Sequence, residues 1–435
     1  MSYHLKRIIY VKVISRLAIL SVCVLGNRNC LLAQEKGLIR SCGAMQVLEH
    51  AFGNSPLLKT KFQKQTVEFQ QSVNKRKTTD PSFRIEGNVI YIPVVFHVVL
   101  TNPAVITDAQ IQAQLNVLNK DFAGMNSDSV NIPAAFKPLF GKSQIQFKLA
   151  QRTPGNEPSK GIVRVTAARS VYSTFDTSLK YSTLGGDDAW DPNRFLNVWI
   201  TNLSGGYVLG YSTLPGSSVP AEEGIAIHYA TLPADSLTPI NRGRTLTHEA
   251  GHFFYLYHIW GDENGCTGTD FVDDTPNQAT LTSGCPGGVM VTDGCSPAAP
   301  GILYQDYMDY TDDACMCLFT WGQVARMETA LNNYHAGYYT SNGADPVPNP
   351  NLISKGFMVT PNPATDAITV QFYPYPLTLK AIILYNSAGQ KIGEQVAREN
   401  GTGQYTFNMS RFAPGVYFVQ AICSDKKLMQ KVIKQ

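Results

Sequence analysis

HEAGH occupies residues 248–252, and His258 follows six residues later; the rest of this 435-residue chain is organised around that stretch. On a helix, His248 and His252 lie one turn apart on one face, so both imidazoles can reach a single ion. Glu249 lies next to them but points elsewhere, and it is better placed to touch a bound water than the metal. Two helical His ligands with a Glu as general base predict the chemistry of a metalloprotease.

A solvated or hydrogen-bonded pair is the commoner meaning of a lone His-x-x-x-His on an amphipathic helix. Here the intervening Glu249 and a third histidine favour a zinc site over that alternative. Only eight histidines occur in the chain, and three of them fall within this stretch. His258 is expected to supply the third zinc ligand once the helix has ended and the chain has turned back.

Length and composition limit the classes of protein to which the chain can belong. With 435 residues it is long enough for two or three domains and at least one large core. A net charge of +3 is nearly neutral for this size, so neither a nucleic-acid surface nor a polybasic membrane anchor is expected. Charged residues make up only 16%, while Gly, Pro and Tyr are plentiful, which fits an extracellular protein rich in turns and strands.

The zinc-binding stretch resembles the metzincin signature, and the residues around it resemble the pappalysin family, which includes ulilysin-like bacterial enzymes. Residues 305–313, QDYMDYTDD, are similar to that family's Met-turn. Between the two motifs, CTGTD at 266–270 and VDDTP at 272–276 also match its pattern. The resemblance covers roughly Asn88 to Tyr334. It implies an α+β fold, namely a metzincin-like catalytic domain with a twisted mixed sheet, a zinc helix and a loop-rich lower subdomain.

The resemblance also implies roles for residues of the Met-turn. Met308 would pack beneath the zinc as an apolar floor. Tyr310 would lie near the metal, where its phenol binds zinc in the resting state or donates to the developing oxyanion. Asp313 matches the position thought to select a basic residue on the primed side in ulilysin-like enzymes. It predicts cleavage before Arg, because a buried carboxylate pairs well with a guanidinium.

One position departs from the metzincin pattern, which has Gly where this chain has Tyr255. Gly takes a positive φ there and lets the third histidine swing inward. A Tyr in the left-handed region costs about 1–2 kcal/mol, so either Tyr255 carries that strain or the helix ends differently. Tyr255 is also the only feature that favours an alternative function, a surface-attached binding protein on a catalytically weakened metzincin scaffold.

The N-terminal region predicts a secretory precursor. A basic start, an apolar run and a Leu-Leu-Ala sequence ending at Ala33 indicate a signal peptide over residues 1–33. Residues 34–84 are polar, include a predicted helix from Met45 to Phe52, and are interpreted as a pro-segment. Cys42 within it is a candidate latency switch, because its thiolate could occupy the open fourth position of the zinc, as in the metzincin zymogens that it resembles. The alternative is a cysteine that is paired or simply free.

Residues 85–340 are interpreted as the catalytic domain. Runs of β-branched and aromatic residues predict strands at 90–100, 145–149, 195–203, 208–215 and 224–232. A capping-box pattern at Thr107 opens a predicted helix, the zinc helix is expected to begin near Asn241, and Thr320 is expected to cap a final helix. The strand at 208–215 contains Gly and ends in Pro, which sheet edges tolerate, so an extended peptide could be added beside it.

A long irregular stretch follows the zinc helix and reaches Ile302, and a loop of this length needs fastening. Five cysteines after the helix suggest disulfides and an oxidising compartment. A second metal site is the alternative, although the spacings lack a pair of Cys-x-x-Cys motifs. The resemblance leaves Cys317 unpaired and implies the disulfides Cys266–Cys295 and Cys285–Cys315.

Hard oxygen ligands in the same loop predict a calcium site. Asp270, Asp273, Asp274 and Thr275 present carboxylate and hydroxyl oxygens, and members of the resembled family often bind calcium here. The alternative is an acidic loop that is merely solvated.

Residues 341–356 have the composition of a linker, and residues 357–435 predict a small all-β sandwich with strands between turns. TPNP at 360–363 and PGVY at 414–417 resemble the C-terminal sorting domain of type nine (Por) secretion. The resemblance implies an export address with the secretion machinery as its partner. A carbohydrate- or protein-binding module is the alternative, although no cluster of exposed aromatic residues demands it.

Together these motifs predict a secreted or cell-surface zinc endopeptidase that is made as a latent precursor. Zinc is the expected cofactor, with calcium as a second, and peptides or proteins are the expected substrates. Glu249 would take a proton as water attacks the peptide carbonyl and then pass it to the leaving amine. Neither a nucleic-acid partner nor a transmembrane segment in the mature protein is expected.

Overall fold

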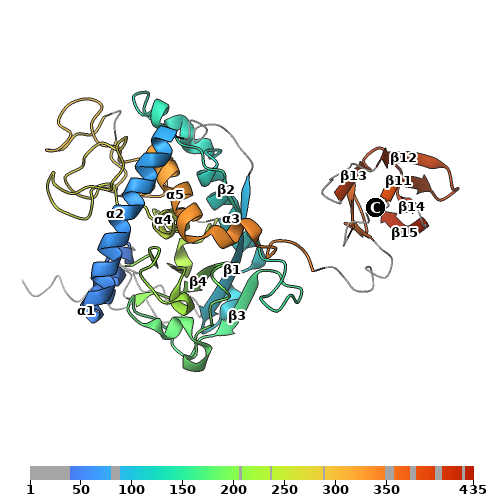
Figure 1. The fold of residues 1–435 in the computed structure, drawn as a ribbon, viewed down its shortest axis with the longest axis horizontal. Helices are drawn as coiled ribbons and strands as arrows, with labels where there is room; N and C mark the ends of the chain where they lie inside the picture. The colour runs from blue at the N-terminus through green and yellow to red at the C-terminus, as the bar shows by residue number, and fades with distance from the viewer. Residues whose placement is uncertain are drawn as a thin grey trace, which may run out of the picture.

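The fold comprises two units with separate hydrophobic cores, the first ending at residue 347 and the second starting at residue 357 (Figure 1). The expected signal peptide lies outside the described residues. Among the described residues, no helix has the length and apolar character that a membrane span requires. The computed structural model describes residues 40–79, 89–204, 208–235, 238–287, 290–347, 357–372, 379–396, 404–423 and 427–435.

A six-stranded mixed sheet is the framework of the first unit. Its strands follow the order β2-β1-β4-β6-β5, and β3 pairs with the second half of β1. All pairs are parallel except β5 with β6, so β5 is an antiparallel edge strand. The strands are β1 (Ile90–Leu100), β2 (Ile145–Leu149), β3 (Ile162–Thr166), β4 (Leu196–Thr201), β5 (Gly210–Ser212) and β6 (Ile225–His228).

Three helices cover and extend this sheet. Helix α3 (Asp108–Phe122) packs on β2 and α4, while α4 (Arg244–Phe253) contacts β5 and β6. Capping boxes open α3 at Thr107 and α5 (Trp321–Tyr334) at Thr320, as predicted. Helix α4 begins later than the predicted Asn241, because the residue before Arg244 is a glycine in the left-handed conformation. Short 3-10 helices lie at Pro103–Val105, Ser127–Asn131, Lys137–Leu139, Thr177–Lys180, Ser182–Leu184, Pro220–Glu222, Tyr229–Thr231 and Ala336–Thr340.

The described part of the expected pro-segment folds into two helices, α1 (Ala44–Asn54) and α2 (Pro56–Thr79). Helix α2 contacts α5 and passes in front of it in Figure 1. Phe62, Phe69 and Val73 of α2 are buried in the main core of the first unit. Burial of large apolar side chains stabilises a contact by about 1.5–3 kcal/mol each, so α2 is held firmly.

The stretch between α4 and α5 is irregular, as its composition predicts. Its described residues contain only two very short strands, β7 (Ser283–Gly284) and β8 (Tyr310–Thr311). Two disulfides fasten it, with the pairing that the resemblance implies, and Cys317 is a buried free cysteine. The disulfides join Cys266 to Cys295 and Cys285 to Cys315.

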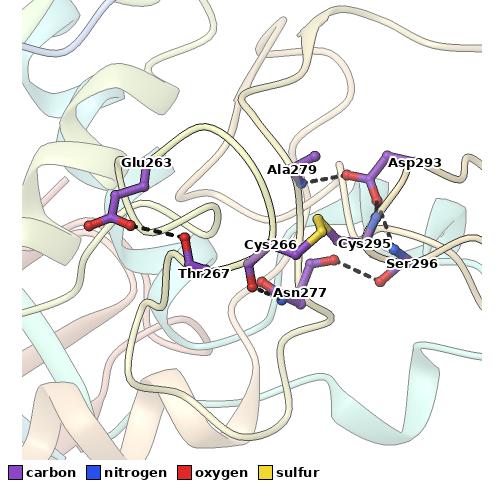
Figure 2. The surroundings of a disulfide bond; sticks show 8 residues. All are labelled: Glu263, Cys266, Thr267, Asn277, Ala279, Asp293, Cys295 and Ser296. Atoms are coloured by element: carbon purple, nitrogen blue, oxygen red, sulfur yellow. Dashed lines mark hydrogen bonds between the residues drawn. A yellow bond between two sulfur atoms is a disulfide. The ribbon is translucent and has the colours of Figure 1, made fainter.

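Hydrogen bonds reinforce the first of these disulfides (Figure 2). The Asp293 carboxylate accepts from the backbone N–H groups of Ala279, Cys295 and Ser296 at 2.6–2.8 Å. The Asn277 side chain donates to the Cys266 carbonyl at 2.9 Å. The covalent bond and these polar contacts together order a segment that has no regular secondary structure.

The second unit consists of two antiparallel sheets that share one core. Residues such as Ile368 and Val370 from one sheet and Leu384 and Val419 from the other are fully buried. This arrangement confirms the predicted small all-β sandwich. One sheet contains β9 (Met358–Thr360), β10 (Ala367–Gln371) and β13 (Gln404–Asn408), and the other contains β11 (Leu379–Asn386), β12 (Lys391–Val396), β14 (Gly415–Cys423) and β15 (Lys427–Lys434).

Candidate active site

Helix α4 carries the predicted site residues His248, Glu249 and His252, and all three side chains are buried. A Cβ atom at Gly251 would lie 2.5 Å from Sδ of Met308, so only glycine lets the Met-turn approach the helix this closely. Met308 is itself fully buried. It therefore packs against α4, the helix that carries two of the predicted zinc ligands, where the resemblance implies an apolar floor.

The backbone fixes the rings of the two helical histidines. Nδ1 of His248 lies 2.7 Å from the Tyr307 carbonyl oxygen, and Nδ1 of His252 lies 2.8 Å from the Leu256 carbonyl oxygen. A carbonyl oxygen can only accept, so both Nδ1 atoms carry the proton. Each Nε2 atom is then left with a free lone pair, the form in which histidine binds metals.

The Nε2 atoms of the three predicted histidines converge. His252 Nε2 lies 3.2 Å from that of His248 and 3.1 Å from that of His258. Sγ of Cys42 joins them in a buried group whose four donor atoms all lie within 4.8 Å of one another. Lone pairs this close repel unless a cation lies between them. Tetrahedral zinc, with Zn–N bonds of about 2.0–2.1 Å, requires N–N separations of about 3.3 Å, so this donor set fits zinc.

Tyr255 brings His258 into the group by adopting the conformation that the metzincin pattern assigns to glycine, with φ of +70°. Its buried ring packs against Phe69 and Tyr334, with ring centroids 4.4 and 5.5 Å apart. Nε of Arg326 donates to the Tyr255 carbonyl at 2.7 Å. These contacts offset a backbone cost of about 1–2 kcal/mol. Of the two alternatives, Tyr255 carries the strain, and it does not displace His258.

Cys42 lies on the edge of the sheet. The Gly43 N–H donates to the Gly210 carbonyl, and the Leu209 N–H donates to the Ser41 carbonyl, both at 2.8 Å. Cys42 and Gly210 form a parallel β-bridge. The start of the described chain is therefore added beside β5, at the edge where the sequence predicts that an extended peptide can bind.

Cys42 also contacts both candidate catalytic residues, Glu249 and Tyr310. Its Sγ lies 3.4 Å from Oε2 of Glu249, and its backbone N–H donates to the Tyr310 hydroxyl at 3.0 Å. Burial, followed by the neighbouring Glu249 charge, raises the pKa of the Cys42 thiol well above its usual value. Burial likewise raises the pKa of Glu249 to about 8, against a lowering effect of the thiol hydrogen bond. In this state both side chains are shielded from solvent and from substrate.

Asp313 is fully buried and uses its two oxygens differently. Oδ2 accepts from the backbone N–H groups of Arg242 and Arg244, at 2.7 and 3.2 Å, and so closes the N-terminus of α4. Oδ1 forms a salt bridge with the guanidinium of Arg40. The predicted specificity residue therefore already holds an arginine, which comes from the expected pro-segment.

Comparisons with known proteins agree with this geometry. A family model described as "Pregnancy-associated plasma protein-A" matches residues 182–332, and one described as "Secretion system C-terminal sorting domain" matches residues 358–435. Extracellular metalloproteases of Pyricularia oryzae and Colletotrichum graminicola are 34% and 35% identical over 58% and 57% of this chain, and 78% of each relative is covered. The chain belongs to the pappalysin family.

Solved structures resemble this pappalysin over the whole length of their own chains. Mature mirolysin of Tannerella forsythia in complex with a cleaved peptide is 43% identical, with a TM-score of 0.57, and the match covers 61% of this chain and 100% of that one. A promirolysin mutant of the same organism is 40% identical, with a TM-score of 0.62, over 72% and 100% of the two chains. The protein is therefore a zinc metalloendopeptidase with an α+β metzincin-like catalytic fold.

The location of this pappalysin also follows from the comparisons. Its relatives are extracellular enzymes, and its C-terminal unit matches the sorting domain over residues 358–435. The protein is secreted or displayed at the cell surface, its substrates are peptides, and its C-terminal domain addresses it to the secretion machinery.

Two of the predicted calcium ligands, Asp270 and Thr275, are in contact with each other. The Asp270 carboxylate accepts from the Thr275 hydroxyl at 2.8 Å and from the Val272 N–H at 3.0 Å. Asp273 is exposed. Asp274 accepts from the Thr320 hydroxyl at 2.7 Å and so supports the start of α5. Calcium at this loop stays a prediction.

The sequence analysis did not assign a role to two residues of this site, Arg40 and Asp262. Arg40 forms a salt bridge with Asp313, and its place two residues before Cys42 was the available signal. Asp262 lies 2.5 Å from Nδ1 of His258, and no motif singled it out. Asp262 follows the predicted ligand His258 by four residues, and this spacing was a weak hint because α4 ends at Phe253 and does not bring the two side chains onto one helix face.

Proposed function

We propose that His248, His252 and His258 hold the zinc ion and that Glu249 is the general base of peptide hydrolysis. The convergence of the three Nε2 atoms at 3.1–3.2 Å carries this proposal. The donor set consists of neutral imidazoles, with a fourth position that only the pro-segment fills. That is the composition of a catalytic rather than a structural zinc site.

When bound, zinc supplies a Lewis acid that makes water nucleophilic near neutral pH and polarises the scissile carbonyl. Glu249 takes the proton of the attacking water and passes it to the leaving amine. A carboxylate can both accept and donate a proton, as this step requires. The Glu249 side chain packs directly against Gly210 of the edge strand β5. A Cβ atom added at Gly210 would lie only 2.9 Å from Cγ of Glu249.

Tyr310 is proposed as a second donor to the oxyanion. In the present state its hydroxyl accepts from the Cys42 N–H at 3.0 Å and donates to the Cys42 carbonyl at 3.3 Å. Departure of the pro-segment frees this hydroxyl. A preorganised donor of this kind typically contributes about 10²–10³ in kcat.

Asp313 is proposed to select Arg on the primed side of the scissile bond. Support comes from Arg40, whose guanidinium pairs with Asp313 Oδ1 while the chain beside it lies along β5. A substrate arginine would take over this pair once Arg40 has left. The buried Oδ1 atom favours arginine because its guanidinium is always charged and forms a charge-assisted hydrogen bond there.

Latency follows from the same contacts. Arg40 fills the specificity site, and Cys42 offers its thiolate to the fourth zinc position, where metal binding deprotonates a thiol despite its raised pKa. We therefore propose Cys42 as the latency switch. The larger share of the chain that promirolysin covers, 72% against 61% for mature mirolysin, supports a pro-segment here as well.

The Cys42→Ala chain is expected to process itself faster than the wild type by roughly an order of magnitude or more, because the fourth zinc position is then open to water. Gel analysis of full-length protein over time measures the rate. Cys317→Ala is the matched control. Cys317 is also a buried free cysteine, but it packs in a separate hydrophobic cluster and does not belong to the group of Cys42 and the three histidines. Equal rates for Cys42→Ala and wild type would contradict the switch.

We also keep Asp270, Asp273 and Thr275 as proposed calcium ligands. Their oxygens are of the hard type that calcium prefers, and burial raises the pKa of Asp270 to about 7, a penalty that a cation would relieve. A calcium titration followed by thermal unfolding should raise the Tm of the wild type and leave that of Asp273→Asn unchanged. A wild-type Tm that does not change with calcium would contradict the calcium site and favour the alternative of a solvated acidic loop.

The proposed domain organisation is a signal peptide at 1–33, a pro-segment at 34–84, a catalytic domain at 85–340, a linker at 341–356 and a sorting domain at 357–435. The match of the sorting-domain model from residue 358 and the separate core of the C-terminal sandwich support the last boundary. The increase in matched length from mature to pro-mirolysin supports the pro-segment.

A further inference from the structure

We propose that Asp262 is a positioning residue that orients His258 and sets the affinity of the site for zinc. The proposal rests on the assignment of His258 as a zinc ligand. Oδ1 of Asp262 lies within hydrogen-bond distance of Nδ1 of His258, at 2.5 Å.

The third histidine differs from the other two in how it is held. His248 and His252 belong to α4 and donate to backbone carbonyls, so their orientation is fixed by the backbone of the Met-turn and of the residues just after α4. His258 lies beyond the end of α4 and depends on a side chain for its Nδ1 contact. A carboxylate is also a stronger acceptor than a carbonyl and makes Nε2 a better electron-pair donor.

The backbone around Asp262 is shaped to deliver this carboxylate. Gly261 and Asp262 have φ of +69° and +60°, so two successive residues are left-handed. A Cβ at Gly261 would lie 2.1 Å from the Thr269 backbone nitrogen, which leaves room only for glycine. Asp tolerates the left-handed region better than most residues, but the conformation still has a cost. Strained backbone that places a side chain against a proposed metal ligand is typical of a functional constraint.

The face of the same ring is fixed by Trp260. The rings of His258 and Trp260 are nearly parallel, with centroids 4.4 Å apart and an interplanar angle of 6°. Trp260 thus limits tilting of the imidazole, while Asp262 sets its rotation about the ring normal. The Asp262 side chain is 28% exposed, so its charge is partly hydrated and carries no large burial penalty.

The test uses the full-length chain with Glu249→Gln, which prevents self-cleavage, and compares Asp262→Asn with Asp262→Ala. Competition with a chromogenic chelator measures zinc affinity. Loss of a carboxylate that supports a metal ligand typically weakens metal binding about 10–100-fold, and Asp262→Ala is expected to fall in this range. Asp262→Asn should lie between it and the wild type, because Asn still accepts and also tolerates the left-handed conformation.

Glu263→Ala is the matched control, because Glu263 is an exposed neighbouring carboxylate that accepts a hydrogen bond from the Thr267 hydroxyl at 3.3 Å. Its zinc affinity should equal that of the wild type. A second readout is the rise in Tm when zinc is added to metal-free protein. A positioning role predicts a smaller rise in both Asp262 variants, whereas a purely structural role lowers the metal-free Tm and leaves the rise unchanged.

His258→Ala separates this proposal from the one on which it rests. If His258→Ala binds zinc as the wild type does, the assignment of the third ligand is wrong. If His258→Ala loses zinc while both Asp262 variants stay within about twofold of the wild type, His258 is a ligand and the role of Asp262 is refuted.

Discussion

Glu249→Gln is expected to lower kcat/KM for peptide hydrolysis by about 10²–10⁴-fold, the usual contribution of a general base. Gln has the same shape as Glu but cannot accept a proton from water. The three histidine Nε2 atoms are untouched by the change, so the zinc content should stay that of the wild type. Both chains are matured with the same trace of trypsin, which is then inhibited, and hydrolysis of a fluorogenic peptide is followed.

Zinc content decides how a loss of activity in Glu249→Gln is understood. Loss of activity with zinc retained supports the role of Glu249 in proton transfer. Loss of both would make Glu249 a residue that maintains the metal site, and retained activity would contradict the mechanism. Glu263→Gln, with its exposed side chain, should match the wild type in both measurements.

Asp313→Asn is expected to reduce kcat/KM for substrates with Arg on the primed side about 30-fold or more, because one partner of a buried charge pair is lost. Asn keeps an oxygen that can still accept from the Arg242 and Arg244 N–H groups at the start of α4. The helix that carries the zinc ligands should therefore stay in place. Thermal unfolding of the variant tests that condition.

A matched peptide with Gln in place of the arginine is the internal control for Asp313→Asn. Its kcat/KM should change little, since the carboxylate has no charge partner in that substrate. An equal loss for both peptides would show that Asp313 supports α4 rather than specificity. Wild-type cleavage without any preference for Arg would contradict the assignment from the substrate side.

Much of the first unit could be predicted because its patterns are local. β1 begins and ends at the predicted Ile90 and Leu100, since a central strand that is buried along most of its length is an almost unbroken apolar run. The helices opened by Thr107 and Thr320 were predicted from their capping pattern. Helix α1 extends the predicted segment, Met45 to Phe52, by a few residues at its ends.

Helix α2 was not predicted, although it is the longest helix among the described residues. Its sequence is dominated by Lys, Gln and Thr, and among its side chains up to residue 76 only Phe62, Phe69 and Val73 are deeply buried. Apolar residues that sparse give no clear amphipathic stripe. The helix is stabilised by tertiary contacts, among them the pair between Arg76 and Glu328 at 2.7 Å, which no local pattern records.

The candidate site also contains residues that local sequence patterns predict and residues that only the tertiary structure brings together. The spacing within residues 248–252 places two imidazoles on one helix face, so these ligands are readable from local sequence. Arg40 meets Asp313 across 273 positions, and Asp262 reaches His258 only through a left-handed turn. Tyr255 adopts a conformation that its residue type disfavours, and only the packing of Phe69 and Tyr334 around it shows why.

Anomalous diffraction at the zinc edge from crystals of the full-length Glu249→Gln chain tests the central claim most directly. We expect one strong peak, about 2.0–2.1 Å from Nε2 of His248, His252 and His258 and about 2.3 Å from Sγ of Cys42. No peak at this position, or a peak that His258 does not approach, would contradict the account of the site.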